Sequence, residues 1–461
     1  MQATPLAGII LAAGKGTRMK SDLAKGLHPV CGLPMVELVV RAMREAGVER
    51  PIVVIGHGGE AMKQALGEDC DYAWQREQLG TGHAALMAAE FLAGYDGPVL
   101  VAPGDAPLLT GAALKRLAGY HRKMQAECTL ASVELDDPTG YGRIVRDKLG
   151  LLTRIVEQKD AYEGVREIKE INVSVYCFDA RTLFRLLPTL GKNNSQGEYY
   201  LTDVLAAIVK EGSHALVEKF EEPETFLGVN DRWQLAEADK ALRRRILRKH
   251  ALSGVTIRDP DTVMIGPDVS IGHDAIIEAG TTLGGKTEVG PGCRVGPYTI
   301  VDDSVLGRNC LVYMSRLSEA RLGDEVKVGP FANLRPGCVL ENRVKVGNFV
   351  EVKNSTIGEG AAASHLAYLG DTSVGPGTNV GAGTITCNYD GFAKHRTEIG
   401  ANAFIGSNST LVAPITIGDG ALIAAGSVIT RDVPADALGL GRAKQEVKEN
   451  WAAQWRKRRK P

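Results

Sequence analysis

The sequence lacks the features that mark several large classes of protein. Over 461 residues the formal net charge is only -1, so the composition implies neither nucleic acid nor an anionic membrane surface as a partner. No uncharged apolar run approaches the roughly 20 residues that a membrane span requires. The apolar N-terminal segment has no basic stretch before it and runs directly into a glycine-rich stretch. This arrangement indicates a buried first strand and not a signal peptide.

The eight cysteines are not spaced as a metal or redox site. At least sixteen residues separate any two of them, which excludes CxxC pairs and a compact disulfide framework. This spacing favours a reducing cytosol, and we expect a cytoplasmic protein. The basic run at 456–460 is the one strong local charge cluster, and we expect it to be a solvated chain end.

The first half of the chain reads as an α/β domain. A content of 44% hydrophobic and 24% charged residues is enough for more than one core. From Pro5 to about Val229, short apolar runs such as PIVVIG and GPVLVAP alternate with helical patterns, which is typical of a mostly parallel sheet. Residues 231–251 contain no Gly or Pro and carry apolar residues near helical spacing, so they predict a connecting helix.

The second half follows a strict six-residue period. This period is the signature of a parallel β-helix, in which each unit contributes one short strand and points one aliphatic side chain inward. We expect the glycine that often follows to let the chain turn the corner. The pattern predicts a break between Val352 and Val374 and a long polar insertion at 381–400. The in-phase residues are Ile265, Ile271, Ile277, Leu283, Val289, Val295, Val301, Leu322, Val328, Leu334, Leu340, Val346, Val352, Ile399, Ile405, Leu411, Ile417, Ile423 and Ile429.

A glycine-rich loop follows the first predicted strand. The segment LAAGKGTRM, from Leu11 to Met19, combines Gly14 and Gly16 with the cations Lys15 and Arg18. Free backbone N–H groups and cations of this kind bind phosphate oxygens. The loop has neither the GxGxxG pattern of dinucleotide enzymes nor the Walker pattern of P-loop proteins.

This loop and the motifs after it resemble those of sugar-nucleotide pyrophosphorylases, and of the N-acetylglucosamine-1-phosphate uridylyltransferases in particular. The matching motifs are QREQLGTGHA (75–84), PGDAPL (103–108), DPTGYGRI (137–144), IVEQKDA (155–161), EIN (170–172), GEYYLTD (197–203) and GVND (228–231). The resemblance implies a Rossmann-like domain that binds UTP and the UDP-sugar through Leu11, Ala12, Ala13, Gly14, Lys25, Gln75, Gly80, Thr81, Gly140, Glu157, Asn172 and Asn230.

The same resemblance implies Mg²⁺ held by Asp105 and Asn230. A sugar 1-phosphate is already an anion, so its attack on UTP needs alignment and charge neutralisation, for which Lys25 and Arg18 are the candidate catalytic cations. Asp105 follows the apolar run VLVAP and so lies at the carboxyl end of a strand, where α/β sheets bind ligands. Two positions depart from the family pattern, namely Gly26 after Lys25, and Ala102-Pro103 before Gly104.

Motifs in the second half resemble the acetyltransferase half of the same bifunctional enzymes. They are FANLRPG, GNFVEVK, SHLAYLGD, GAGTITCNYDG and FIGSNSTLVAP. The resemblance implies a left-handed β-helix, a homotrimer with a shared acetyl site, and His365 as general base, a role that suits imidazole near neutral pH. Arg335, Lys353, Tyr368 and Asn379 would bind glucosamine 1-phosphate with Lys394 nearby. Acetyl-CoA would contact Ala382, Tyr389, Ser407, Ala425 and Arg442, and Asn388 is implied at both ligands.

The leading hypothesis is therefore a bifunctional transferase that supplies a precursor of peptidoglycan and lipopolysaccharide. Acetyl-CoA and glucosamine 1-phosphate give N-acetylglucosamine 1-phosphate, which reacts with UTP to give UDP-N-acetylglucosamine. We expect a pyrophosphorylase domain at 1–229, a linker helix at 230–250 and an acetyltransferase domain at 251–461. Two alternatives stay open, namely a nucleotidyltransferase with the β-helix as an oligomerisation module, and a binding protein with decayed sites.

Overall fold

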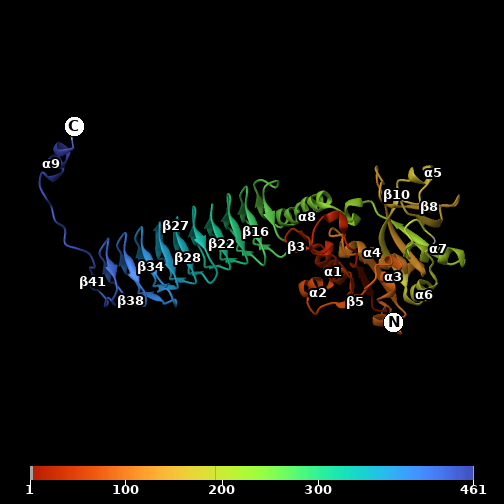
Figure 1. Ribbon diagram of the computed structural model, residues 1–461, viewed down its shortest axis with the longest axis horizontal. Coiled ribbons are helices and arrows are strands. Elements are labelled where there is room, and N and C mark those ends of the chain that lie inside the picture. The colour runs from red at the N-terminus through yellow and green to blue at the C-terminus, as the bar shows by residue number, and fades with distance from the viewer. Residues whose placement is uncertain (1–3, 193, 460–461) are drawn as a thin grey trace. The chain divides into compact units, whose positions relative to one another are not determined.

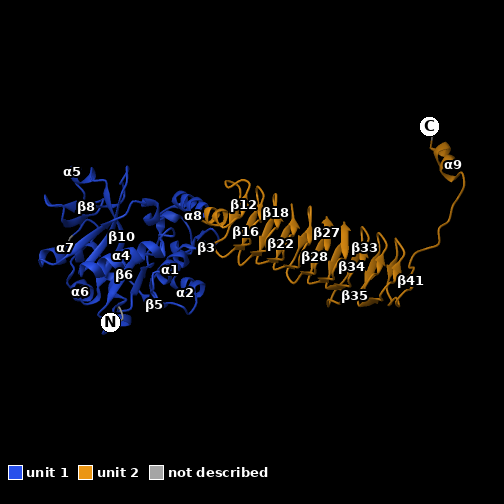
Figure 2. Cartoon of the chain, turned by 180° about the vertical axis from the view of Figure 1, so that it is seen from behind, with its two compact units in different colours: residues 1–245 blue, residues 246–461 orange. Residues whose placement is uncertain are grey.

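The computed structural model describes residues 4–192 and 194–459. The chain divides into two compact units, residues 1–245 and 246–461 (Figure 2). The boundary falls within α8 (Arg232–Leu252), which confirms the helix predicted at 231–251. The assignment of a separate function to 1–229, 230–250 and 251–461 remains a prediction.

The first unit is built on a mixed sheet (Figure 1). Its main strand order is β11-β7-β10-β6-β1-β4-β5, and β8 and β9 extend it beside β10. Neighbours in the main order are parallel except at β10, which lies antiparallel to β6 and β7. The predicted α/β fold is therefore confirmed. The strands are β1 (Ala7–Leu11), β4 (Ile52–Ile55), β5 (Asp71–Trp74), β6 (Pro98–Pro103), β7 (Cys128–Glu134), β8 (Gly142–Arg146), β9 (Leu152–Val156), β10 (Glu170–Asp179) and β11 (Ala215–Lys219), with a separate hairpin of β2 (Pro29–Val30) and β3 (Leu33–Pro34).

Helices cover both faces of this sheet. Successive strand residues point to opposite faces, so Ile9 and Ile10 of β1 enter different cores. The core that contains Ile10 packs against α1 (Met35–Glu45), α2 (Gly59–Leu66) and α4 (Gly111–Met124). The other core packs against α3 (Thr81–Leu86), α6 (Ala180–Leu186) and α7 (Thr202–Lys210). The short elements are α5 (Glu163–Arg166), η1 (Thr17–Met19), η2 (Lys25–Leu27), η3 (Ala89–Leu92), η4 (Leu187–Thr189) and η5 (Pro223–Phe226).

The second unit is a three-sided parallel β-helix. Every third strand pairs in parallel with the next of its kind, which builds three sheets of 11, 10 and 9 strands among the described residues. This arrangement is consistent with the expected left-handed β-helix of hexapeptide repeats. The 11-stranded sheet comprises β12 (Thr256–Ile257), β15 (Ile276–Ile277), β18 (Arg294–Val295), β21 (Leu311–Val312), β24 (Lys327–Val328), β27 (Lys345–Asn348), β30 (Ala362–His365), β33 (Asn379–Val380), β36 (Phe404–Ile405), β39 (Leu422–Ile423) and β41 (Leu438–Gly439).

The other two sheets follow the same pattern. The 10-stranded sheet comprises β13 (Met264–Ile265), β16 (Thr282–Gly284), β19 (Ile300–Asp302), β22 (Arg316–Ser318), β25 (Asn333–Leu334), β28 (Glu351–Lys353), β31 (Tyr368–Gly370), β34 (Ile385–Cys387), β37 (Thr410–Val412) and β40 (Val428–Ile429). The 9-stranded sheet comprises β14 (Ser270–Ile271), β17 (Glu288–Val289), β20 (Val305–Leu306), β23 (Arg321–Leu322), β26 (Val339–Leu340), β29 (Thr356–Ile357), β32 (Thr372–Val374), β35 (Thr397–Ile399) and β38 (Ile415–Ile417).

The predicted break between Val352 and Val374 is wrong. Ile357, Ala363 and Leu369 are buried in the same aliphatic column, six residues apart, and a step of five residues joins them to Val352 on one side and to Val374 on the other. The segment SHLAYLGD therefore forms the regular strands β30 and β31 instead of an insertion. The true insertion is shorter than predicted. It spans 388–396 between β34 and β35 and is closed by a bridge between Tyr389 and Lys394.

At two corners, the glycine that follows the inward-pointing aliphatic residue is required for a reason other than the predicted one. A Cβ on Gly272 would lie 2.6 Å from the nitrogen of Pro291, and one on Gly290 would lie 2.3 Å from the carbonyl oxygen of Gly307. Both close contacts are with the backbone of the next coil. At these corners glycine is therefore required because a Cβ atom would collide with the neighbouring coil. At Gly296 a φ of 101° is a second reason for glycine.

The C-terminal segment carries a short exposed helix, α9 (Trp451–Arg458). Trp451 and Trp455 stack on each other with ring centroids 6.3 Å apart, and both rings are exposed. Arg456 to Arg459 are exposed as predicted, and Lys460 lies outside the described residues. Within 4–192 and 194–459, none of the helices combines the length and the apolar character needed to cross a membrane.

Candidate active sites

A cavity of about 290 Å³ lies in the first unit beside the carboxyl end of β6. Asp105 follows β6 at this edge, as predicted from the run VLVAP. Five of the predicted site residues line the cavity: Arg18, Asp105, Gly140, Asn172 and Asn230. Ser174 and Gln234, which lie outside the quoted motifs, also line it, as does Tyr141, to which the motif DPTGYGRI gave no predicted role.

Four predicted residues converge on one point of this cavity. Lys25 Nζ forms an ion pair with the carboxylate of Asp105 and donates a hydrogen bond of 2.9 Å to Oδ1 of Asn230. Arg18 donates to the same Asn230 oxygen over 2.8 Å. The backbone supports this meeting, because the N–H of Val229 donates to the carbonyl of Asp105 over 2.8 Å. Residues up to 212 positions apart are thus brought together.

The donor set at this point suits a hard cation. Asp105 and Asn230 present one carboxylate and one amide oxygen to the same ammonium group, so both face one small volume. Mg²⁺ prefers oxygen ligands and is commonly held by one or two protein groups together with phosphates and water. The part of the chain that the structure describes has no cluster of three or more His, Cys, Asp or Glu side chains that could hold a metal without such help.

The glycine-rich loop is shaped by Lys25. Gly16 has a φ of 59°, and a Cβ there would lie 2.7 Å from Cβ of Lys25, so only glycine lets the lysine pass beneath the loop. A Cβ on Gly14 would meet nothing within 4 Å, which leaves open space on that side. Leu11 and Ala12 are held to neighbouring strands by backbone hydrogen bonds with Gly104 and Val54.

The predicted base-binding residues form a second cluster, outside the lining of the 290 Å³ cavity. Gln75 is buried, and its amide donates to the carbonyl of Gly80 over 3.0 Å. A Cβ on Gly80 would lie 2.5 Å from the carbonyl oxygen of Tyr199. Thr81 Oγ1 accepts from the N–H of Leu201 over 3.0 Å. Gly80 and Thr81 therefore hold the segment at 199–201, a structural role that their motif did not predict.

The residues predicted to bind the sugar line two separate cavities. Asn172 is buried at the cavity, where its amide donates to the hydroxyl of Tyr176 over 2.8 Å and accepts from the N–H of Ser174 over 3.1 Å. Glu157 instead lines a separate cavity of about 390 Å³. Burial raises the pKa of Glu157, and the nearby carboxylate of Asp160 raises it further.

Packing explains the unusual Gly26. A Cβ at this position would lie 3.3 Å from both Cε of Met62 and Cβ of Val36. These side chains fill the space that a β-branched residue would occupy in the family pattern. The second departure from the family pattern is Ala102-Pro103. Ala102 is fully buried, and Pro103 lines the cavity.

In the second unit, His365 lies at a corner of the β-helix. It ends β30, where it faces Asn348 of β27 in the parallel register. The Nδ1 atom of His365 lies 2.7 Å from Oδ1 of Asn348. An amide oxygen only accepts, so Nδ1 carries the proton and Nε2 keeps its lone pair. Asn348 was not predicted from the sequence, because its partner is seventeen residues away.

The predicted acetyl-CoA residues continue this corner. Backbone hydrogen bonds join the corners of successive coils, from Gly383 to Leu366 over 2.8 Å, Asn408 to Ala382 over 2.7 Å, and Gly426 to Ser407 over 2.8 Å. Ladder register therefore stacks the predicted residues His365, Ala382, Ser407 and Ala425 in one column. Arg442 follows the last coil, next to Gly441, whose carbonyl accepts from Val428 over 3.0 Å.

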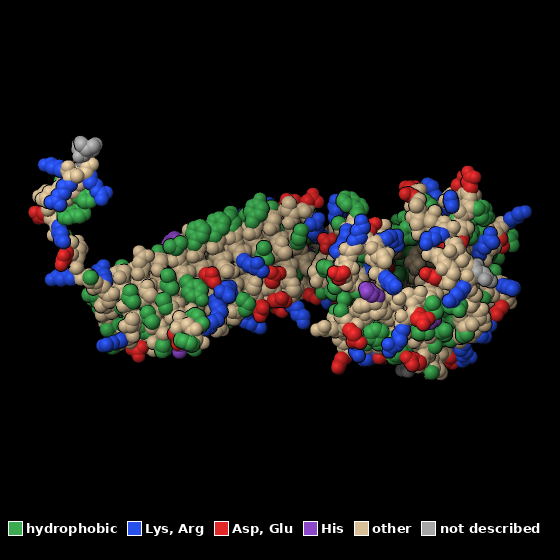
Figure 3. Space-filling view, viewed as in Figure 1, with side chains coloured by type: hydrophobic (Ala, Val, Ile, Leu, Met, Phe, Trp, Pro, Cys, Tyr) green, Lys and Arg blue, Asp and Glu red, His purple; other side chains and the backbone are tan. Residues whose placement is uncertain are grey.

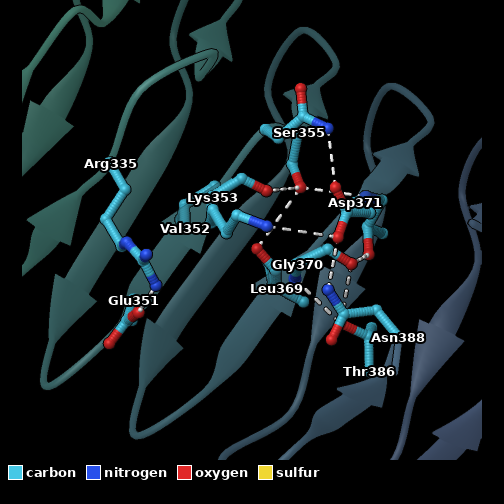
Figure 4. Close-up of polar contacts among 12 residues, drawn as sticks. Arg335, Glu351, Val352, Lys353, Ser355, Leu369, Gly370, Asp371, Thr386 and Asn388 are labelled. Carbon is cyan, nitrogen blue, oxygen red and sulfur yellow. Dashed lines mark hydrogen bonds and ion pairs between the residues drawn. The ribbon is translucent and has the colours of Figure 1, made fainter. Parts of the chain in front are cut away.

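A polar cluster occupies the next corner along the chain (Figure 4). Asp371 is buried and accepts hydrogen bonds from Asn354, over 2.6 Å, and from Asn388. Lys353 Nζ lies 3.5 Å from the same carboxylate. Burial alone would raise the pKa of Asp371, but the hydrogen bonds from both amides and the charge of Lys353 outweigh it and lower the pKa.

Cations gather beside this carboxylate. Lys394 lies beside Lys353, and this cationic neighbour lowers the pKa of Lys394. Arg335 lies one coil before Lys353 and pairs with Glu351 at 3.0 Å (Figure 4). Tyr368 starts the next strand of the same sheet, with its hydroxyl 2.5 Å from where a Cβ of Gly370 would be.

One of the residues predicted to bind glucosamine 1-phosphate lies apart from the others. Asn379 begins β33 in the 11-stranded sheet, whereas Lys353 and Tyr368 lie in the 10-stranded sheet. Its ladder partners are Ala362 and Phe404. The predicted glucosamine 1-phosphate residues therefore occupy two different faces of one chain.

Comparisons with known proteins find matches in both halves of the chain. The family described as the MobA-like NTP transferase domain matches residues 8–171, and the hexapeptide repeat of succinyl-transferase matches residues 396–431. A protein from Heliobacterium modesticaldum, named bifunctional protein GlmU, is 51% identical over 443 residues, which cover 96% of this chain and 97% of the relative. The bifunctional protein GlmU of Geobacillus thermodenitrificans is 48% identical and covers 98% of both chains. The chain belongs to the bifunctional GlmU family.

Membership in the GlmU family confirms the predicted enzyme class. The chain is a bifunctional transferase with uridylyltransferase and acetyltransferase activity. A nucleotidyltransferase that carries the β-helix only as an oligomerisation module is correspondingly disfavoured. Relatives that match at 46–51% identity all extend over both halves, so the β-helix is part of what defines GlmU proteins.

Proposed function

We propose that the cluster of Lys25, Asp105 and Asn230 is the uridylyl-transfer centre and that the cluster around His365 and Lys353 is the acetyl-transfer centre. The supporting observation in the first unit is that Lys25, Asp105 and Asn230 converge through side-chain contacts. In the second unit it is that His365 and Lys353 lie at successive corners of the β-helix, each beside a polar partner. The acetyl centre makes N-acetylglucosamine 1-phosphate, and the uridylyl centre converts that product and UTP to UDP-N-acetylglucosamine and pyrophosphate.

At the uridylyl centre, the chain aligns two anions. A phosphate oxygen of the sugar 1-phosphate attacks the α-phosphorus of UTP, and pyrophosphate leaves. The nucleophile is already ionised, so the chain needs no general base, and Lys25 and Arg18 neutralise the phosphate charges. Gln75, Gly80 and Thr81 hold uracil, while Gly140, Glu157 and Asn172 line the sugar. Leu11, Ala12, Ala13 and Gly14 border the phosphates.

Asp105 and Asn230 would hold Mg²⁺. When bound, this ion neutralises charge that develops on the phosphate oxygens. Both oxygens pair with the ammonium of Lys25. We therefore expect Lys25 to turn from Asp105 toward the phosphates when nucleotide and metal bind, because a phosphate oxygen then replaces the carboxylate as its partner.

At the acetyl centre, His365 removes a proton as the sugar amine attacks the thioester carbon. The free Nε2 atom accepts this proton and passes it to the departing sulfur, so CoA leaves as the thiol and the imidazole returns to its neutral form. Lys353, Lys394 and Arg335 bind the sugar phosphate, whose charge relieves the repulsion between the two lysines. Ala382, Tyr389, Ser407, Ala425 and Arg442 border acetyl-CoA along the column that His365 begins, and Asn388 joins the two ligands' sites.

The acetyl centre is completed by other copies of the chain, in a homotrimer. Asn379 lies on a different sheet from Lys353, so one chain does not bring both to the same ligand. A row of hydrophobic side chains also runs along one edge of the second unit (Figure 3). Two exposed side chains of the β-helix, Phe331 and Phe349, stack with ring centroids 5.4 Å apart. A mass of three times the chain mass in sedimentation equilibrium would support the trimer, and a monomer mass would contradict it.

The free thiols of all eight cysteines support a cytoplasmic location.

Separate loss of the two reactions tests the proposed centres. The purified protein is supplied with glucosamine 1-phosphate, acetyl-CoA, UTP and Mg²⁺, and free thiol and pyrophosphate are measured. We expect His365→Ala to lose thiol release while still converting supplied N-acetylglucosamine 1-phosphate. We expect Asp105→Ala to lose pyrophosphate release while still acetylating.

Matched variants control for unspecific effects. His273 is another exposed histidine of the β-helix, paired with Asp274, and Asp69 is an exposed carboxylate paired with Arg44. We expect His273→Ala and Asp69→Ala to keep both reactions. If either active-centre variant stopped both reactions while the fold stayed intact, the assignment of separate centres would be wrong.

A further inference from the structure

The first turn of α8 contacts the uridylyl centre through two side chains that no motif predicted. Gln234 lines the 290 Å³ cavity, and its Oε1 accepts the backbone N–H of Asn230 over 2.7 Å. The oxygen Oδ1 of the same Asn230 accepts from Lys25 and Arg18. Gln234 therefore fixes the backbone of the residue on which the two cations converge.

The neighbouring Arg232 contacts both cation-bearing segments. Its Nε donates to the carbonyl of Met19 over 3.2 Å, and Met19 directly follows Arg18. Its Nη1 lies 3.2 Å from Nδ1 of His28, three residues after Lys25. Burial of His28 and then the charge of Arg232 lower the pKa of this histidine. A neutral imidazole that accepts at Nδ1 is the form that a guanidinium donor requires.

The helix start is itself well anchored. Asp231 Oδ1 accepts the N–H of Gln234 over 2.9 Å, and the carbonyl of Asp231 accepts the N–H of Leu235 over 3.0 Å. An aspartate that accepts in this way caps a helix and sets the direction in which its first turn leaves. Leu235 and Ala238 then pack into a small core with Val30 and Met35. The first turn is thus a rigid support next to the cavity.

We propose that Gln234 and Arg232 are positioning residues for uridylyl transfer, and that the first turn of α8 sets the distance between Asn230 and the cations Arg18 and Lys25. This inference rests on the proposed uridylyl centre. Both side chains act through Asn230, Met19 and His28, and we assign them no contact with the reacting atoms. Loss of the Gln234 acceptor frees the Asn230 backbone, so its side-chain oxygen no longer lies fixed opposite Asp105.

The test compares Gln234→Leu with Gln234→Glu in the full chain. Leucine has a similar volume and helix propensity but no acceptor, whereas glutamate keeps an acceptor oxygen. We expect Gln234→Leu to raise the Mg²⁺ concentration for half-maximal uridylyl transfer about 5- to 10-fold, the effect of about one lost hydrogen bond. Calorimetric binding of UDP-N-acetylglucosamine with Mg²⁺ should weaken by a similar factor. Acetyl transfer should not change.

Controls separate the inference from the function on which it rests. Glu237 is exposed on the same helix, and Glu237→Leu should leave the Mg²⁺ requirement and ligand affinity unchanged. Gln234→Glu should keep most of the wild-type affinity. A wild-type chain without uridylyl transfer would overturn the proposed function. An active wild type together with an unchanged Gln234→Leu, or a Gln234→Leu that loses both transfers equally, would overturn the positioning role alone.

Discussion

The Nδ1 atom of His365 lies 2.7 Å from Oδ1 of Asn348, its ladder partner on the preceding coil. This contact selects the tautomer that leaves Nε2 free to accept a proton. We expect Asn348→Ala to lower kcat for acetyl transfer about 10- to 100-fold, since general-base catalysis contributes about 10²- to 10⁴-fold and only its orientation is lost. In a His365→Ala background, the same substitution should have no further effect. An additive loss in this double-mutant cycle would show that Asn348 acts elsewhere.

Asp371 organises the corner at which we propose that the sugar phosphate binds. Asp371→Asn removes the carboxylate that Lys353, Asn354 and Asn388 share, and we expect KM for glucosamine 1-phosphate to rise about 10-fold with uridylyl transfer unchanged. The lowered pKa of Asp371 means that its ionised form stabilises the fold. This stability is present above the ordinary carboxyl pKa of 3.8 and is lost as pH falls through the lower folded value. Denaturation curves of wild type and variant should therefore converge only below pH 3.8.

Gly26 is predicted to be required by packing. A valine there would press on Met62 and Val36, and we expect Gly26→Val to lower the free energy of unfolding of the first unit by about 1–3 kcal/mol. Urea denaturation followed by circular dichroism measures this loss. Gly119 lies in α4 with nothing within 4 Å of a Cβ, so Gly119→Ala should instead stabilise by about 0.5–1 kcal/mol. An unchanged free energy of unfolding in Gly26→Val would mean that Met62 and Val36 move to make room for the valine.

His121 is predicted to make the first unit sensitive to acid. Burial lowers its pKa from 6.5 to about 4, and its Nδ1 lies 3.1 Å from Oγ1 of Thr129. The unfolded chain takes up the proton first, so stability is complete above pH 6.5 and falls as pH decreases toward 4. The loss reaches about 3 kcal/mol for this group. His121→Asn should flatten the decline in unfolding free energy between pH 6.5 and 4, which urea denaturation at a series of pH values measures.

The sequence predicted the elements of the fold well because their signals are local. The six-residue period identified the β-helix, and α8 begins and ends within one residue of the predicted helix at 231–251. The error between Val352 and Val374 came from requiring a strict period. The column continues through steps of five from Val352 to Ile357 and from Leu369 to Val374, because a corner can lose one residue while the next strand keeps its pairing.

The candidate sites were predicted only in part, for a physical reason. Motifs identified Lys25, Asp105 and His365, since such residues stand in recognisable neighbourhoods. Asn348, Gln234 and Arg232 carry no comparable signal. Asn348 and Arg232 form hydrogen bonds with residues 17 or about 200 positions away. Gln234 bonds to Asn230 only four positions away, but this contact gains its meaning from the distant cations that meet Asn230.

The sequence by itself determined the two kinds of architecture, the order of the motifs and the chemical types of the candidate residues, because periodicity and composition act over a few neighbouring positions. Only the tertiary structure decided which of these residues meet. Lys25 reaches Asp105 because the parallel strands β1 and β6 end at one edge of the sheet, and Asn230 joins them because Val229 hydrogen-bonds to the backbone of Asp105. His365 stacks with Asn348 because ladder hydrogen bonds hold successive coils in register. The same ladders place Asn379 on a different sheet from Lys353, a separation that no spacing along the chain could reveal.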